Sequence, residues 1–135
     1  MNLTIYTDGA SKGNPGVGFA LAHITVDNED HYEVIKLLGP DVTNNQAEYE
    51  GMILALLNVF KLKQERFPSI MNTTIYTDSQ LLEGQLTKGW KINKNKGLVV
   101  YCKDLLKKTK NISSVSIKWV RREENKAGIR LEQLL

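Results

Sequence analysis

The sequence lacks the features that mark disulfide-linked, membrane-spanning or low-complexity proteins. Its 135 residues include three prolines and one cysteine, Cys102, which can form no internal disulfide and has no cysteine or histidine partner at metal-ligand spacing. We therefore expect Cys102 to be a small core residue of a helix. No stretch approaches the roughly 18 apolar residues of a membrane span, and the chain starts without a signal-peptide pattern. These absences predict a cytoplasmic protein that does not contact membranes.

The composition is that of a globular domain. Hydrophobic residues make up 41% of the chain and charged residues 24%, and the mean hydropathy is -0.30. The length predicts one domain over residues 1–135, large enough to bury a core without disulfides or metals. The net charge of +3 is compatible with a polyanionic partner but does not demonstrate one. Nothing in the sequence argues against a monomer.

Lysines gather in two places along the chain. One group follows a predicted helix near residues 103–110, and a solvated helix face explains it. The other surrounds an aromatic residue, Trp90, in a predicted loop (Lys88, Lys91, Lys94 and Lys96). Cations mixed with an aromatic ring are typical of contacts with a nucleic-acid backbone.

One five-residue segment, TIYTD, occurs twice, at residues 4–8 and 74–78. Each copy is a β-branched and aromatic run that predicts a buried or half-buried strand, and each ends in an aspartate, Asp8 or Asp78. If the strands lie side by side and parallel, both acids open onto the crevice beyond the carboxyl ends of the sheet. Two ionised carboxylates there repel unless a cation or a proton lies between them. Two unrelated strands that end in turn-forming aspartates are the alternative.

The order of predicted elements indicates an α/β fold. A strand up to Asp8 is followed by a Gly-, Asn- and Pro-rich turn over residues 9–18 and by a hairpin that ends at Gly39 and Pro40. The remaining elements are a helix from Thr43 or Asn44, a strand at 74–78, helices at 79–86 and 96–110, a strand at 113–120 and a helix at 123–135. This order predicts a mixed five-stranded sheet, three antiparallel strands and then parallel additions, with helices on both faces.

The first long helix carries a third candidate acid. Glu48 shares a helix face with Gly51 and Ala55, small residues that permit close approach to a sheet. A carboxylate on such a face is costly to bury without a partner. Glu50 is the rival, because the helix is apolar almost all round and periodicity does not choose between them.

Four segments in chain order resemble those of type 1 ribonuclease H, over essentially the whole chain. They are TDGASKGNPG at residues 7–16, TNNQAEYEG at 43–51, TDSQ at 77–80 and VRREENK at 120–126. The resemblance implies a ribonuclease H-like fold. It also implies an endoribonuclease that hydrolyses the RNA strand of an RNA/DNA hybrid, leaving 5′-phosphate and 3′-hydroxyl ends.

The same resemblance implies that Asp8, Glu48 and Asp78 are metal-binding catalytic acids, which favours Glu48 over Glu50. It implies two Mg²⁺ ions roughly 3.5–4 Å apart, with Mn²⁺ as a substitute. Hard cations of this kind prefer oxygen ligands, which carboxylates supply. The sequence places no histidine near these acids to act as a base.

The resemblance also assigns substrate contacts. It implies that Thr43 binds a DNA phosphate, that Trp90 and its lysines touch the DNA strand, and that the RNA strand is contacted by Gly9 (through its backbone), Asn14, Asn44, Asn45 and Gln80. Short amides and backbone groups are suited to the 2′-hydroxyl, which separates RNA from DNA. Capping the helix is an equally good role for Asn44. The longer basic handle of some members is absent, so we expect weaker substrate affinity, which a salt-dependent binding titration would test.

One part of the family pattern is broken. Most members carry a fourth acid in a last-helix pattern such as NKEAD, but here residues 125–129 are Asn, Lys, Ala, Gly and Ile, so that Ile129 takes the place of the aspartate. A shift by one residue puts Gly128 there, and the loop histidine of some members is missing too. These losses predict weaker metal binding and slower turnover. The candidates for a substitute ligand are Glu124, Asn125 and Glu132.

The intact acids and RNA-contacting residues favour an active enzyme. The alternative is a weakly active or inactive protein that binds RNA/DNA hybrids or double-stranded RNA, which would explain the lost acid. Another nuclease or a strand-transfer enzyme of the same fold is disfavoured, because TNNQAEYEG and GNPG resemble the ribonuclease segments specifically.

Overall fold

The computed structural model describes residues 1–135. In chain order the elements are β1 (Asn2–Gly13), β2 (Gly16–Val26), β3 (Asp30–Val42), α1 (Asn44–Glu65), β4 (Asn72–Thr77), α2 (Gln80–Thr87), α3 (Lys96–Lys110), β5 (Ser114–Trp119), the 3-10 turn η1 (Arg122–Glu124) and α4 (Lys126–Leu134). None of the helices combines the length and the apolar character that crossing a membrane requires.

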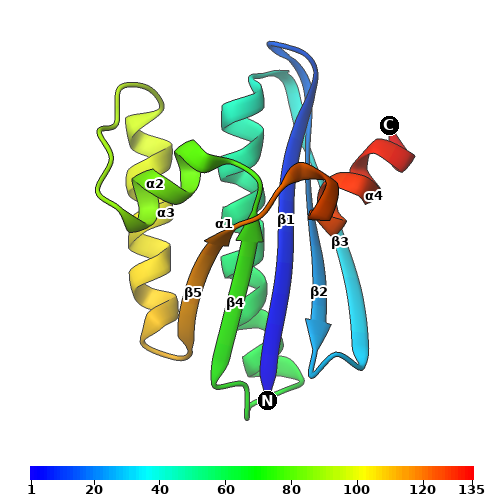
Figure 1. Ribbon diagram of the computed structural model, residues 1–135, viewed down its shortest axis with the longest axis vertical. Coiled ribbons are helices and arrows are strands. Elements are labelled where there is room, and N and C mark those ends of the chain that lie inside the picture. Colours follow the sequence, from blue (N-terminus) through cyan, green and yellow to red (C-terminus); the bar gives the residue numbers. More distant parts are fainter.

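The five strands form one mixed sheet in the order β3-β2-β1-β4-β5. The pairs β1–β2 and β2–β3 are antiparallel, whereas β4 is parallel to β1 and β5 is parallel to β4 (Figure 1). The predicted fold class, three antiparallel strands followed by parallel additions, is therefore confirmed. The two TIYTD segments are neighbours in this sheet, with Ile5 opposite Ile75 and Tyr6 opposite Tyr76.

The first hairpin is longer than the sequence predicts. The turn expected over residues 9–18 is wrong, because β1 continues to Gly13 and β2 starts again at Gly16, with Ala10 opposite Phe19. Only Gly13, which has a φ of +96°, and the two residues after it are needed for the reversal. Cross-strand pairing therefore outweighs the local turn signal of this segment.

The predicted end of the third strand at Gly39 and Pro40 is also wrong, since β3 runs to Val42. Because β3 is an edge strand, a proline there need not break a ladder hydrogen bond. Gly39 has a φ of +113° and lies at an irregularity of the β2–β3 register, which takes up the extra residue. The helix expected over 123–135 is divided by Asn125 into η1 and α4.

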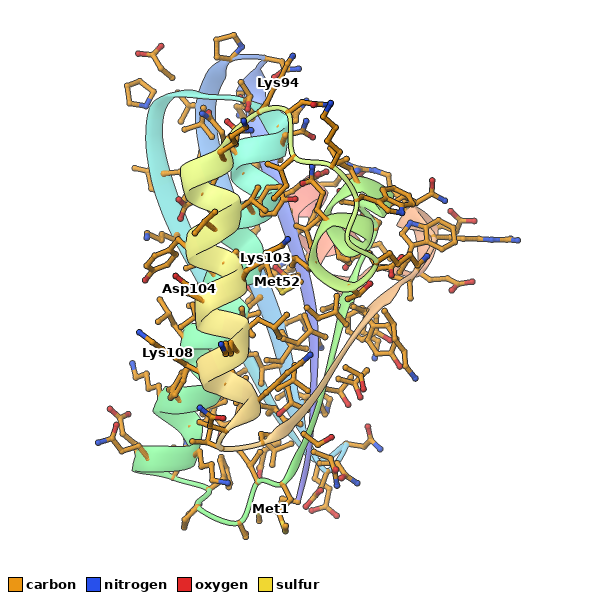
Figure 2. The ribbon with its side chains drawn as sticks, turned by 90° about the vertical axis from the view of Figure 1, so that its left-hand side faces the viewer. Met1, Met52, Lys94, Lys103, Asp104 and Lys108 are labelled. Carbon is orange, nitrogen blue, oxygen red and sulfur yellow. The ribbon has the colours of Figure 1, made fainter.

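Helices cover both faces of the sheet. On one face α1 and α3 enclose the main core, in which Met52, Leu56 and the predicted core residue Cys102 are fully buried. Figure 2 views the sheet from its side, with α3 in front and Met52 in the core behind it, while Asp104 and Lys108 point outward from α3. On the opposite face α4 packs over β1 and β2 through Ala127 and Leu131 (Figure 1).

Helix α1 lies very close to β1 at Asp8. A Cβ atom on Gly9 would lie 2.0 Å from the backbone carbonyl of Ala47, and one on Gly51 would lie 2.8 Å from the backbone oxygen of Asp8. Real Cβ atoms do not approach backbone atoms this closely. The two glycines therefore allow the first turns of α1, which carry Glu48, to rest on the strand that carries Asp8.

Replacing Gly9 with alanine should destabilise the protein by about 2–3 kcal/mol, because the added methyl group forces α1 away from β1. Urea unfolding followed by circular dichroism would measure the change. Gly97→Ala is the matched control, because a Cβ on Gly97 in helix α3 meets nothing within 4 Å. It should be neutral or stabilising by up to about 1 kcal/mol. Equal losses in the two variants would contradict the close packing at Gly9.

Candidate active site

Three carboxylates meet where the repeated segments end. Asp8 lies within β1, Asp78 directly follows β4, and Glu48 is in the first turns of α1. One ligand oxygen from each of the three residues lies within 4.8 Å of the others. The convergence of the two aspartates predicted from the TIYTD segments is thus confirmed, although Asp8 lies inside β1 and not at its end. Glu48, not Glu50, is the helix acid that joins them. Glu50 lines a separate hollow with Lys36 and Leu98.

Burial makes these acids hard to ionise together. Asp8 is only 4% exposed, and burial, with Asp78 beside it, raises the pKa of Asp8 to about 7. Burial also raises the pKa of Glu48 to about 7, against a hydrogen bond from Ser79 that lowers it. Near neutral pH the group therefore needs protons or a cation. Three converging carboxylates are a suitable donor set for a hard divalent cation such as Mg²⁺.

The start of α4 closes over the acids. A Cβ on Gly128 would lie 3.1 Å from Oδ2 of Asp8 and 3.5 Å from Oδ2 of Asp78, so the helix backbone faces both carboxylates. The side-chain nitrogen of Asn125, Nδ2, donates a hydrogen bond to Oδ2 of Asp78 at 3.1 Å. A guanidinium nitrogen of Arg122 lies 4.0 Å from the same oxygen. The site is thus bordered by a neutral donor and a cation from the last part of the chain.

The structure places the proposed substitutes for the fourth acid as follows. The side-chain oxygen of Asn125 accepts from the backbone N–H of Ala127, and its nitrogen points to Asp78, which is not the arrangement of a metal ligand. Glu132 is paired with Arg122 at 3.3 Å and so is linked to Asp78 through that arginine. Burial raises the pKa of Tyr6, and Glu124 lies close enough to Tyr6 to raise that pKa further. Neither glutamate joins the three-acid cluster.

Ile129, which takes the place of the fourth acid in the family pattern, is 43% exposed. It lines a surface hollow beside the acids together with Arg122, Glu123, Gly128 and Glu132. The residue whose α-carbon faces the carboxylates is its neighbour Gly128. The residue of α4 that faces the cluster therefore adds no carboxylate to it.

The predicted RNA-contacting residues of the first two segments lie together. Thr43, not Asn44, caps α1, since its hydroxyl accepts from the backbone N–H of Gln46 in a complete capping box. The backbone N–H of Asn44 instead donates to the side-chain oxygen of Asn14, and its own side-chain oxygen accepts from the backbone N–H of Ser11. These bonds join the hairpin tip to the start of α1. The substrate contacts of Gly9, Asn14, Thr43 and Asn44 stay predictions.

The other predicted substrate residues lie at helix starts and on the loop after α2. Asn45 and Gln80 are exposed, and Asn45 lines a hollow with Gln85 and Lys94. Trp90 is 44% exposed, and its ring rests on Gly84, where a Cβ would lie 2.1 Å from the ring. The ring is thus held in place by α2 while its outer side stays accessible. Contact of these residues with substrate also stays a prediction.

Sequence reasoning missed two residues at this site. Ser79 caps α2 and hydrogen-bonds Glu48, and its position directly after Asp78 is the signal that could have identified it. Arg122 lies beside Asp78, but its run of charged residues, Arg-Arg-Glu-Glu at 121–124, is equally typical of an exposed loop. Only the fold indicates which of the two neighbouring arginines faces the acids.

Comparisons with known proteins identify the family of this chain and its fold. The family model described as RNase H matches residues 1–128. The ribonuclease H of Lachnoclostridium phytofermentans is 34% identical over 136 residues, covering 90% of this chain and 80% of that protein. The crystal structure of RNase H1 from Halobacterium salinarum NRC-1 superposes with a TM-score of 0.79 at 28% identity, over 97% of this chain and 94% of that one. LC11-RNase H1, solved in complex with an RNA/DNA hybrid, superposes with a TM-score of 0.74 at 26% identity, over 92% of this chain and 88% of that one.

The sequence segments, the mixed sheet and the three converging acids all lie within the part of the chain that the family model matches. That match spans nearly the whole chain, as does the superposition on RNase H1 from Halobacterium salinarum. This chain belongs to the ribonuclease H family.

Proposed function

We propose that this protein is an endoribonuclease that hydrolyses the RNA strand of RNA/DNA hybrids, leaving 5′-phosphate and 3′-hydroxyl ends. The observation that carries the proposal is the convergence of Asp8, Glu48 and Asp78, with ligand oxygens within 4.8 Å of one another. Family membership and the hybrid bound by LC11-RNase H1 support the choice of substrate. We further propose that the protein acts as a cytoplasmic monomer.

The acids fit a divalent-metal centre. Asp8, Glu48 and Asp78 would hold the metal, two Mg²⁺ ions in the proposed mechanism, with Mn²⁺ as a substitute. When bound, such ions lower the pKa of the attacking water and stabilise the negative charge that develops in the transition state. The raised pKa values of Asp8 and Glu48 show that the three acids cannot all ionise at low cost without a positive counter-charge.

The chain's own residues would set the direction of the substrate. The bond between the backbone N–H of Asn44 and the side chain of Asn14 joins the hairpin tip to the start of α1, the helix that carries Glu48, and short amides there would read the 2′-hydroxyls of the RNA strand. Trp90 and the lysines around it would contact the DNA strand on the other side, through stacking and phosphate charge. Arg122 would add a positive charge where the scissile phosphate meets Asp78.

The test is cleavage of a labelled RNA/DNA hybrid beside DNA and RNA duplexes of the same sequence, in Mg²⁺, Mn²⁺ and EDTA. Asp8→Asn serves as the inactive control. Cleavage of the hybrid alone that requires metal and disappears in the control would establish the enzyme. Hybrid or double-stranded RNA binding without cleavage in either metal would select the alternative, a binding protein that lost activity with its fourth acid.

Ile129→Asp should strengthen metal binding, because it restores a carboxylate at the position that the family pattern assigns to the fourth acid. The half-saturating Mg²⁺ concentration for hybrid cleavage should fall on the order of tenfold. The exposure of Ile129 makes the change tolerable for folding. Ile129→Asn, with the same shape and no charge, is the matched control. An equal gain in both variants, or none in either, would contradict this role for position 129.

A further inference from the structure

The side chain of Asn125 joins three separate parts of the molecule. It is fully buried, and its nitrogen donates both to the backbone oxygen of Thr7 at 3.0 Å and to Oδ2 of Asp78 at 3.1 Å. Its oxygen accepts from the backbone N–H of Ala127 at 3.1 Å and caps α4. The two N–H groups of the side-chain amide are thus both in use, one on Thr7 of β1 and one on Asp78.

These bonds restrict Asp78 in particular. Asp78 directly follows the last residue of β4, so its backbone lies just beyond the carboxyl end of the strand, where its carbonyl oxygen accepts a hydrogen bond from the indole N–H of Trp119 at 3.0 Å. The cap at Ala127 fixes the oxygen of the Asn125 amide, and the bond to Thr7 fixes the direction of its nitrogen. A planar amide held at both ends has one orientation, so it presents an N–H to one carboxylate oxygen only. The other oxygen of Asp78 stays available to a cation.

We propose that Asn125 is a positioning residue that orients the Asp78 carboxylate for metal binding. This inference rests on the proposed function. It assigns to the start of α4 a role distinct from that of a metal ligand: in a chain without the fourth carboxylate, α4 acts on the metal centre through a neutral hydrogen bond to an existing ligand. Groups that orient metal ligands in this way typically change metal affinity 10–100-fold when removed.

The experiment compares Asn125→Ser with Leu131→Ala. Serine caps helices about as well as asparagine but has no N–H group and is shorter, so it keeps the cap and loses the donor. Leu131 is buried in an apolar cluster with Leu21 and Ala127 and has no group that can hydrogen-bond Asp78, so its truncation loosens α4 without removing a donor to that carboxylate. Asn125→Ser should raise the half-saturating Mg²⁺ concentration about tenfold, in both thermal-shift titration and cleavage, with the KM for the hybrid unchanged. Leu131→Ala should lower the melting temperature and leave the Mg²⁺ midpoint within about twofold.

A Mg²⁺ midpoint unchanged in Asn125→Ser, or shifted equally in Leu131→Ala, would overturn the proposal, since the effect would then be absent or merely structural. A second measurement uses the wild-type protein and does not depend on the folding of a variant. The ¹⁵N side-chain amide signal of Asn125 should move during a Mg²⁺ titration, whereas that of Asn58, which donates to the carbonyl of Leu54 within α1, should not. Equal behaviour of the two amides would also overturn it. A wild-type protein that neither binds Mg²⁺ nor cleaves the hybrid would instead reject the proposed function.

Discussion

Replacing Asp8 with asparagine is expected to abolish hybrid cleavage and, in the absence of metal, to make the folded protein more stable. The loss of activity follows from the removal of one of three carboxylates that hold the metal. A loss of about 4 kcal/mol of transition-state stabilisation corresponds to a rate about a thousandfold lower. Single-turnover cleavage of the labelled hybrid in saturating Mg²⁺ would measure it.

The gain in stability has an electrostatic cause. Asp8 is buried beside Asp78 and Glu48, and these acids raise its pKa further above the effect of burial. Asparagine has the same shape without the charge, so at about pH 8 and in EDTA the melting temperature should rise by roughly 5 °C. Addition of Mg²⁺ should raise the melting temperature of the wild type and have little effect on the variant.

Glu50→Gln is the matched control for this substitution. Glu50 lies on the same helix as Glu48, two residues further along, and outside the three-acid cluster. Its replacement should leave the cleavage rate and the response to Mg²⁺ unchanged. An Asp8→Asn protein that still cleaves would show that Asp8 does not hold the metal. One that melts below the wild type in EDTA would show that the buried charge of Asp8 does not destabilise the fold.

The second large effect is on pH dependence: the metal-free protein should lose stability as the pH rises from about 5 to about 8.5. The pKa of Asp8 is raised from 3.8 to about 7 and that of Glu48 from 4.5 to about 7. At pH values between the ordinary and the raised pKa of each acid, the folded state binds more protons than the unfolded state, so the stability of the folded state falls as the pH rises. The contribution is fully present below about pH 4 and is lost above about pH 7. For Asp8, the rise in pKa from 3.8 to about 7 corresponds to a change in the free energy of unfolding on the order of 4 kcal/mol.

Urea unfolding in EDTA across this pH range would measure the slope. In saturating Mg²⁺ the slope should flatten or reverse, because the cation replaces the protons and binds more tightly as the acids ionise. In Asp8→Asn the slope in EDTA should be much smaller than in the wild type. A metal-free wild type whose stability is constant from about pH 5 to about pH 8.5 would contradict the raised pKa values.

The repeated TIYTD segment determined much of the site by sequence alone. Two identical strands with the same ending predict two acids at equivalent places, and parallel pairing of Tyr6 with Tyr76 realises that prediction. Local signals also located the helices, because caps and apolar periodicity depend on residues near in sequence. The absence of the fourth acid is likewise evident from the sequence, because Ile129 stands where the family pattern has an aspartate.

Only the tertiary structure decided which residues complete the site. Periodicity does not separate Glu48 from Glu50 in a helix that is apolar almost all round, whereas the close contacts of Gly9 and Gly51 place Glu48 against Asp8. Turn residues predict a long loop after Asp8, yet pairing of β1 with β2 extends both strands past it. The bond between Asn125 and Thr7 spans 118 positions. Contacts of this kind depend on where distant segments meet, and no local pattern in the sequence encodes them.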